Sequence, residues 1–145
     1  MFKHILLPTD GSPLSQVAVQ KGIRFAKEID AKVTGLCVVP EAYHAIYEGE
    51  IPGSFQDKAM AECKAQAKIQ LSGIVKAAEE AGVSCGTVLE TSDEPYESII
   101  KVAEQKGCDL IMMASHGRRG VGALLLGSET QKVLTHSTVP VLVYR

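Results

Sequence analysis

Five short apolar runs alternate with four helix-length segments along this chain of 145 residues. The run at residues 32–39, KVTGLCVV, is almost continuously apolar, which is typical of a strand that helices cover on both faces. Because a helix-length crossover joins each run to the next, we expect the strands to lie parallel in one sheet. The sequence therefore predicts an α/β fold with a five-stranded parallel sheet, strand order 3-2-1-4-5 and helices on both faces. The expected strands are residues 3–8, 32–39, 83–89, 109–114 and 139–144, and the expected helices are residues 13–30, 56–81, 93–107 and 128–136.

Capping residues indicate where the expected helices begin. Ser12 is placed to cap the first helix, with Pro13 at a position where the missing N–H costs nothing. Ser92 or Asp93 is expected to cap the third helix. The residues Ser128–Gln131, SETQ, have the pattern of a capping box at the start of the fourth helix. The residues expected to face the core from the first helix are Leu14, Val17, Ala18, Phe25 and Ile29.

Charge and composition limit the possible classes of function. Fifteen basic and seventeen acidic residues leave a net charge of -2, so no overall positive field favours nucleic acid or an anionic membrane. With 46% hydrophobic residues, the chain is expected to form one domain over residues 1–145. The apolar run near the N-terminus is too short for a signal peptide or a membrane span, which predicts a cytoplasmic protein without membrane insertion. The cysteines form no CxxC pair and are expected to be buried free thiols at Cys37, Cys63, Cys85 and Cys108.

The stretch from Leu110 to Gly127, LIMMASHGRRGVGALLLG, is the candidate ligand site. An apolar strand ends there at a glycine-rich, doubly basic segment, and a helix start follows. Backbone N–H groups and the helix dipole converge at such a helix N-terminus and bind phosphates. With strand order 3-2-1-4-5, the switch point between the first and fourth strands brings Pro8–Ser12 opposite Ala114–Gly120. We therefore predict a phosphate-bearing ligand between these two segments.

Two motifs resemble those of the universal stress protein family. The residues Ala114–Gly117, ASHG, are followed by nine residues and then by Gly127 and Ser128, and residues 5–12 near the N-terminus are ILLPTDGS. Nucleotide-binding members of the family carry Gly, two residues, Gly, nine residues, Gly and then Ser or Thr. The resemblance covers essentially the whole chain, and three of the four motif positions match. Ala114 stands where the motif has its first glycine.

The resemblance implies a flavodoxin-like or Rossmann-like fold of the adenine nucleotide alpha hydrolase type, and a homodimer that pairs through the C-terminal strand Val139–Tyr144. It also implies bound ATP or AMP, with Thr9 and Val38 near the adenine. Asp10 is expected to accept from the ribose or adenine or to hold Mg²⁺ through water, and its alternative role is an Asx turn or a helix cap. The residues expected to bind the nucleotide are Pro8, Thr9, Asp10, Val38, Met113, Ala114, Ser115, His116, Gly117, Arg118, Arg119, Gly120, Gly127, Ser128, Glu129 and Thr130.

Three functions stay open. A nucleotide-responsive regulatory module in a stress response is the interpretation that the motifs favour. The chain has no GxxxxGK[ST] loop and no GxSxG elbow, so an efficient hydrolase is not expected. A slow Mg²⁺-dependent ATP hydrolase would depend on Asp10 and His116. A nucleotide-free dimeric interaction module would act through the apolar terminal strand, because an unpaired edge invites association.

Two segments near the expected site have more than one interpretation. Arg118 and Arg119 would either neutralise a phosphate tail or face solvent. The irregular residues 40–55 are either a lid over the ligand or a disordered loop.

Overall fold

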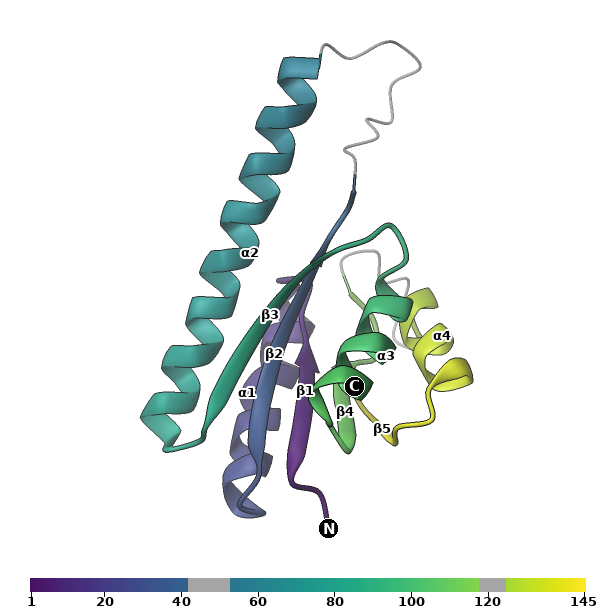
Figure 1. Ribbon diagram of the computed structural model, residues 1–145. Helices are drawn as coiled ribbons and strands as arrows, with labels where there is room; N and C mark the ends of the chain where they lie inside the picture. Colours follow the sequence, from purple (N-terminus) through teal and green to yellow (C-terminus); the bar gives the residue numbers. More distant parts are fainter. Residues whose placement is uncertain (42–52, 118–124) are drawn as a thin grey trace.

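The computed structural model describes residues 1–41, 53–117 and 125–145. Its strands are β1 (His4–Pro8), β2 (Lys32–Val39), β3 (Cys85–Thr91), β4 (Leu110–Ala114) and β5 (Val141–Tyr144), and its helices are α1 (Pro13–Glu28), α2 (Gly53–Ala81), α3 (Pro95–Lys106) and α4 (Ser128–His136). The strands form one parallel sheet in the order β3-β2-β1-β4-β5 (Figure 1). The predicted α/β architecture and strand order are confirmed.

The helices cover the sheet in two pairs, α1 with α2 on one face and α3 with α4 on the other (Figure 1). Side chains of β1 divide between the two faces, because successive residues of a strand point in opposite directions. Ile5 and Leu7 pack in the core beneath α1 and α2, whereas Leu6 packs in the core beneath α3 and α4. Burial on both faces explains why the central strands are continuously apolar.

The start of α1 confirms the sequence prediction. Ser12 is the N-cap residue, its Oγ accepts a backbone N–H at 3.3 Å, and Pro13 follows in the first turn. The predicted core face is partly wrong, because Val17 is 42% exposed. The buried positions of α1 include Gly22, where a Cβ would overlap the side chain of Leu7 on β1. Small residues therefore let α1 lie close to the sheet, and the buried face is rotated away from Val17.

The start of α4 differs from the predicted capping box. Gly127 is the N-cap residue, Ser128 is already helical, and no side chain caps the first turn. Instead, the Gln131 side chain donates to the Leu126 carbonyl at 2.9 Å. A contact outside the helix explains the difference from the prediction. The Gly127 N–H donates to the Ser115 carbonyl at 2.7 Å, and this hydrogen bond holds the start of α4 against the end of β4.

The predicted caps of α3 are also wrong. Glu94 is the N-cap residue and makes no side-chain capping bond. Asp93 accepts the Glu41 N–H at 3.0 Å, so its carboxylate joins the end of β2 to the β3–α3 turn. Ser92 accepts the Glu94 N–H at 3.0 Å within that turn. Both predicted caps therefore stabilise the turn before α3.

Two strands, β3 and β5, begin two residues later than predicted. Val83 lies in the turn that follows α2, because its N–H donates to the Ala78 carbonyl at 2.8 Å and Gly82 has the left-handed φ of 76° that ends the helix. β5 begins at Val141. All four cysteines are free as predicted, but two of them, Cys63 and Cys85, are only partly buried. Over the described ranges, no helix combines the length and apolar content needed to cross a bilayer.

Candidate functional site

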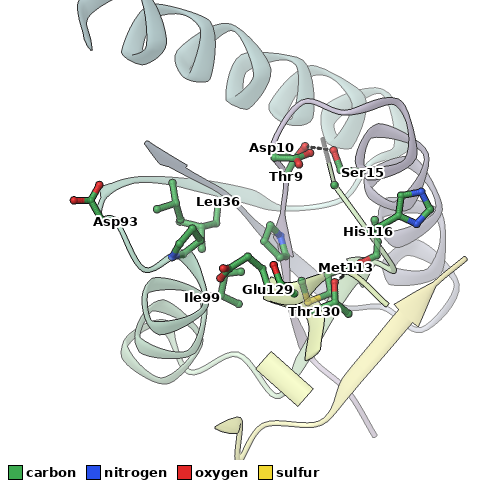
Figure 2. Close-up of a pocket in the computed structure, with 17 residues that line it drawn as sticks. Thr9, Asp10, Ser15, Leu36, Asp93, Ile99, Met113, His116, Glu129 and Thr130 are labelled. Atoms are coloured by element: carbon green, nitrogen blue, oxygen red, sulfur yellow. Dashed lines mark hydrogen bonds between the residues drawn. The ribbon is translucent and has the colours of Figure 1, made fainter. Parts of the chain in front are cut away.

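A cleft of about 410 Å³ opens at the carboxyl ends of β1 and β4, at the switch point predicted from the strand order (Figure 2). This volume falls in the range of small-molecule sites, which is roughly 300–1,000 Å³. Its walls come from the ends of β1, β2 and β4, the β1–α1 loop, and the first turns of α3 and α4. The predicted site residues that line it are Pro8, Thr9, Asp10, Val38, Met113, Ala114, His116, Gly117, Gly127, Ser128, Glu129 and Thr130.

Other predicted site residues do not line the cleft or cannot be placed. Ser115 is buried outside the cleft wall, where its N–H donates to the Tyr144 carbonyl of β5 at 2.7 Å. Its hydroxyl lies 3.1 Å from His116 Nδ1. Arg118, Arg119 and Gly120 lie outside the described residues, as do residues 42–52 of the predicted lid or loop.

Sequence reasoning missed several residues of the cleft wall. Leu36 of β2 and Ile99 of α3 have the pattern of core residues, and both are buried in the core between the sheet and helices α3 and α4. Leu36 pairs with Pro8 in the parallel register of β1 and β2, so the carboxyl end of the neighbouring strand was the signal that could have identified it. The missed lining residues are Ser15, Leu36, Asp93, Pro95 and Ile99.

The β1–α1 loop holds the Asp10 carboxylate at the cleft. Gly11 has a φ of 79°, which favours glycine, and its N–H donates to Thr9 Oγ1 at 3.1 Å. The Ser12 N–H donates to Asp10 Oδ1 at 2.9 Å, which is the Asx turn expected as one alternative. The second carboxylate oxygen, Oδ2, faces Gly117. The turn therefore orients Asp10 toward the opposite loop.

Gly117 is the point at which the two loops meet. A Cβ at this position would overlap Asp10 Oδ2 and would lie 3.1 Å from Asp10 Cγ. Among the described glycines, a positive φ occurs at Gly11, Gly82 and Gly107, so the backbone of Gly117 suits other residues as well. Glycine is needed here for the close approach of the Asp10 carboxylate.

Ala114 stands at the first glycine position of the motif without backbone strain. It ends β4, pairs with Tyr144 of β5, and its carbonyl accepts from Thr130 Oγ1 at 3.0 Å. Within the described ranges, Asp30 is the non-glycine residue with a positive φ, so Ala114 has an ordinary backbone conformation. The difference from glycine is therefore one methyl group beside the cleft.

Two helix N-termini meet at the mouth of the cleft, where Pro95 begins α3 and Ser128 begins α4. The first N–H groups of a helix have no acceptor within the helix and favour anions. Glu129 of α4 accepts the Tyr96 N–H of α3 at 3.0 Å. The Glu129 carboxylate also lies 3.5 Å from Lys132 Nζ and raises the pKa of that amine. The Glu129 carboxylate thus already accepts a hydrogen bond from the N-terminal turn of α3.

The remaining wall of the cleft is largely apolar. Leu36 and Val38 come from β2, Ile99 from α3 and Met113 from β4. Such a surface suits the face of a flat, weakly polar group beside the polar β1–α1 loop. In the part of the chain that the structure describes, no group of three or more His, Cys, Asp or Glu side chains is arranged to hold a metal ion.

The model of the universal stress protein family matches residues 1–145. The chain belongs to this family. Universal stress protein MJ0531 of Methanocaldococcus jannaschii is 35% identical over 146 residues, which cover 100% of this chain and 83% of that protein. Universal stress protein YxiE of Bacillus subtilis is 33% identical over 152 residues, which cover 100% of both chains. The family resemblance found in the motifs is therefore confirmed.

Solved structures share the fold of this universal stress protein. Protein MJ0577 of M. jannaschii superposes with a TM-score of 0.82 at 31% identity, over 99% of this chain and 95% of that one. A universal stress protein in complex with cAMP gives a TM-score of 0.71 at 20% identity, over 99% and 97% of the two chains. The Archaeoglobus fulgidus protein in complex with dAMP gives 0.69 at 18% identity, over 100% and 98%. At these last two identities, the likeness is one of fold.

Proposed function

We propose that this universal stress protein binds an adenine nucleotide, ATP or AMP, in the cleft between β1 and β4 and acts as a nucleotide-responsive regulatory module in a stress response. The observation that carries the proposal is the composition of one cleft, in which an apolar wall, the oriented Asp10 carboxylate and the N-terminus of α4 converge. The universal stress proteins solved with cAMP and dAMP support an adenylate as the ligand.

Each part of the nucleotide has a chemically suited partner in the cleft. The adenine ring packs against the apolar wall that includes Leu36 and Val38. The ribose hydroxyls donate to the Asp10 carboxylate, whose Oδ2 faces away from its own turn. The phosphate lies at the N-terminus of α4, where the hydroxyl of Ser128 and the first N–H groups are donors.

The same arrangement fits a Mg²⁺ ion bound together with phosphates. Mg²⁺ usually keeps several waters and takes one or two protein carboxylates beside the phosphate oxygens. Asp10 supplies such a carboxylate at the cleft, and Ser128 supplies a hydroxyl on the opposite wall. When bound, the ion would neutralise charge on a di- or triphosphate.

Mass spectrometry of the nucleotide released on denaturing the purified protein tests the proposal. Stoichiometric recovery of AMP or ATP is the expected result, with a reduced yield from Asp10→Asn. Asp57→Asn provides the matched control, because Asp57 is exposed on α2 away from the cleft. Equal nucleotide yields from Asp10→Asn and the wild type would remove Asp10 from the proposed site.

A slow Mg²⁺-dependent ATP hydrolase is the second candidate, because Asp10 and His116 line the same cleft. In such a hydrolase, the two side chains would help a water molecule to attack the terminal phosphate of ATP. Each would act as a general base or through a bound metal ion. Release of phosphate from ATP should fall at least about tenfold in Asp10→Ala and in His116→Ala. A rate that survives both changes would come from a contaminating enzyme or from passive catalysis in which neither side chain takes part.

We also propose that the protein forms a homodimer through the C-terminal strand predicted at Val139–Tyr144. β5 lies at an edge of the sheet, and Leu142 on it is 38% exposed. An apolar edge strand is a ready template for pairing with another chain. Sedimentation should give a dimer for the wild type and a monomer for Leu142→Lys, whereas a monomeric wild type would refute this contact.

A further inference from the structure

Gln70 of α2 reaches the loop that carries Asp10. Its Oε1 accepts a hydrogen bond from the Cys37 thiol of β2 at 3.4 Å. The same amide group lies against Gly11, where a Cβ would overlap Gln70 Nε2 and would lie 2.7 Å from Gln70 Cδ. Gly11 is therefore required for two reasons, its φ of 79° and the closeness of the Gln70 amide.

The peptide of Gly11 is also held by its own loop. Its N–H donates to Thr9 Oγ1 at 3.1 Å, and its carbonyl accepts from Gln16 Nε2 at 3.1 Å. The next N–H, that of Ser12, is the donor that orients Asp10 Oδ1. Displacement of Gly11 would thus move the donor on which the direction of the Asp10 carboxylate depends.

Gln70 is an unusual residue for its place on α2. Ala67, Leu71 and Ile74 around it on the helix are buried against the sheet, as expected for an apolar face. Gln70 is half-buried among them, and its amide is oriented by Cys37 toward Gly11. It does not line the cleft itself, so any effect on a ligand would pass through the loop.

We propose that Gln70 is a positioning residue for the nucleotide site, because its amide supports Gly11 from α2 and thereby holds the Asp10 carboxylate toward Gly117. This inference rests on the proposed nucleotide binding for its effect on affinity. Its structural part, support of the β1–α1 loop by α2, is testable in the ligand-free protein.

The test compares Gln70→Ala with Gln66→Ala. Gln66 is exposed one turn earlier on the same helix, so the two changes alter helix propensity equally. Hydrogen exchange of the Ser12 amide, measured without ligand, should be about tenfold faster in Gln70→Ala and unchanged in Gln66→Ala. If Gln70→Ala does not fold, Gln70→Met keeps most of the side-chain bulk, and a smaller acceleration is expected.

Calorimetric titration with AMP supplies the second measurement. Gln70→Ala should raise Kd about tenfold, and the same change in the Asp10→Asn background should add no further loss, because both act on one contact. Unchanged Ser12 exchange in Gln70→Ala, or two fully additive losses of affinity, would overturn the inference. If the wild type binds neither AMP nor ATP, and Ser12 exchange is still accelerated in Gln70→Ala, the proposed function alone would be overturned.

Discussion

Gly117→Ala tests the contact between the two loops of the cleft. The new Cβ would overlap Asp10 Oδ2, so the carboxylate must rotate, while the backbone at Gly117 has no positive φ to oppose alanine. Rotation breaks the 2.9 Å bond from the Ser12 N–H. Loss of this hydrogen bond to a charged group costs about 1.5–3 kcal/mol of unfolding free energy, which lowers Tm by roughly 3–12 °C in a domain of about 150 residues.

Nucleotide affinity should fall together with stability in Gly117→Ala. A hydrogen bond to a charged group contributes about 1.5–3 kcal/mol, so the Kd for AMP should rise by roughly tenfold or more. Calorimetric titration measures Kd, and thermal unfolding measures the stability of the same sample. Gly73→Ala on α2 is the matched control, because a Cβ there meets no atom within 4 Å. Wild-type affinity in Gly117→Ala would refute a role for the Asp10 carboxylate in binding.

Three further experiments have defined outcomes. Glu129→Gln removes a negative charge from the cleft mouth, so calorimetry should show a lower Kd for ATP by roughly threefold and a smaller change for AMP; equal changes would contradict this. Burial lowers the pKa of His4 below its usual value of 6.5, so the folded protein favours the neutral ring. The contribution of His4 to the free energy of unfolding is therefore complete above pH 6.5, and it is lost as the pH falls through the pKa of the folded state. In His4→Gln, the loss of unfolding free energy on acidification from pH 6.5 to about 5 should therefore be smaller, and an unchanged slope would refute the assignment. Burial raises the pKa of the Cys108 thiol to about 11, which makes it less reactive than the partly buried Cys63. Peptide mapping of the native protein after iodoacetamide at about pH 8 should therefore find Cys63 alkylated well before Cys108. Equal alkylation rates at the two thiols would contradict the burial of Cys108.

The strand order and the position of the cleft were predictable because they depend on local patterns repeated along the chain. Each apolar run ends at turn-forming residues, and the crossovers have helix length, so few topologies remain. The switch-point rule then predicted Pro8–Ser12 opposite Ala114–Gly120, and the cleft lies between Pro8–Asp10 and the described part of that second segment. The cap of α1 was equally local, because Ser12 and Pro13 act within one turn.

The errors occurred where distant contacts decide the local structure. Ser128–Gln131 has the sequence of a capping box, yet Gly127, whose N–H donates to the Ser115 carbonyl, is the N-cap residue in place of Ser128. Asp93 does not cap α3, because it accepts from the end of β2. Gln70 lies about sixty positions from Gly11 in the sequence, and their contact depends on how α2 packs on the sheet. Such contacts have no signature in the sequence near either residue.

The proposal that this universal stress protein binds an adenine nucleotide is tested most directly by calorimetric titration of nucleotide-free protein with AMP and ATP, with and without Mg²⁺. The expected result is saturable binding of one nucleotide per chain with Kd below about 1 mM, weakened at least about tenfold in Asp10→Asn. The absence of a binding signal for both nucleotides at millimolar concentration, from protein shown to be folded, would contradict the proposal.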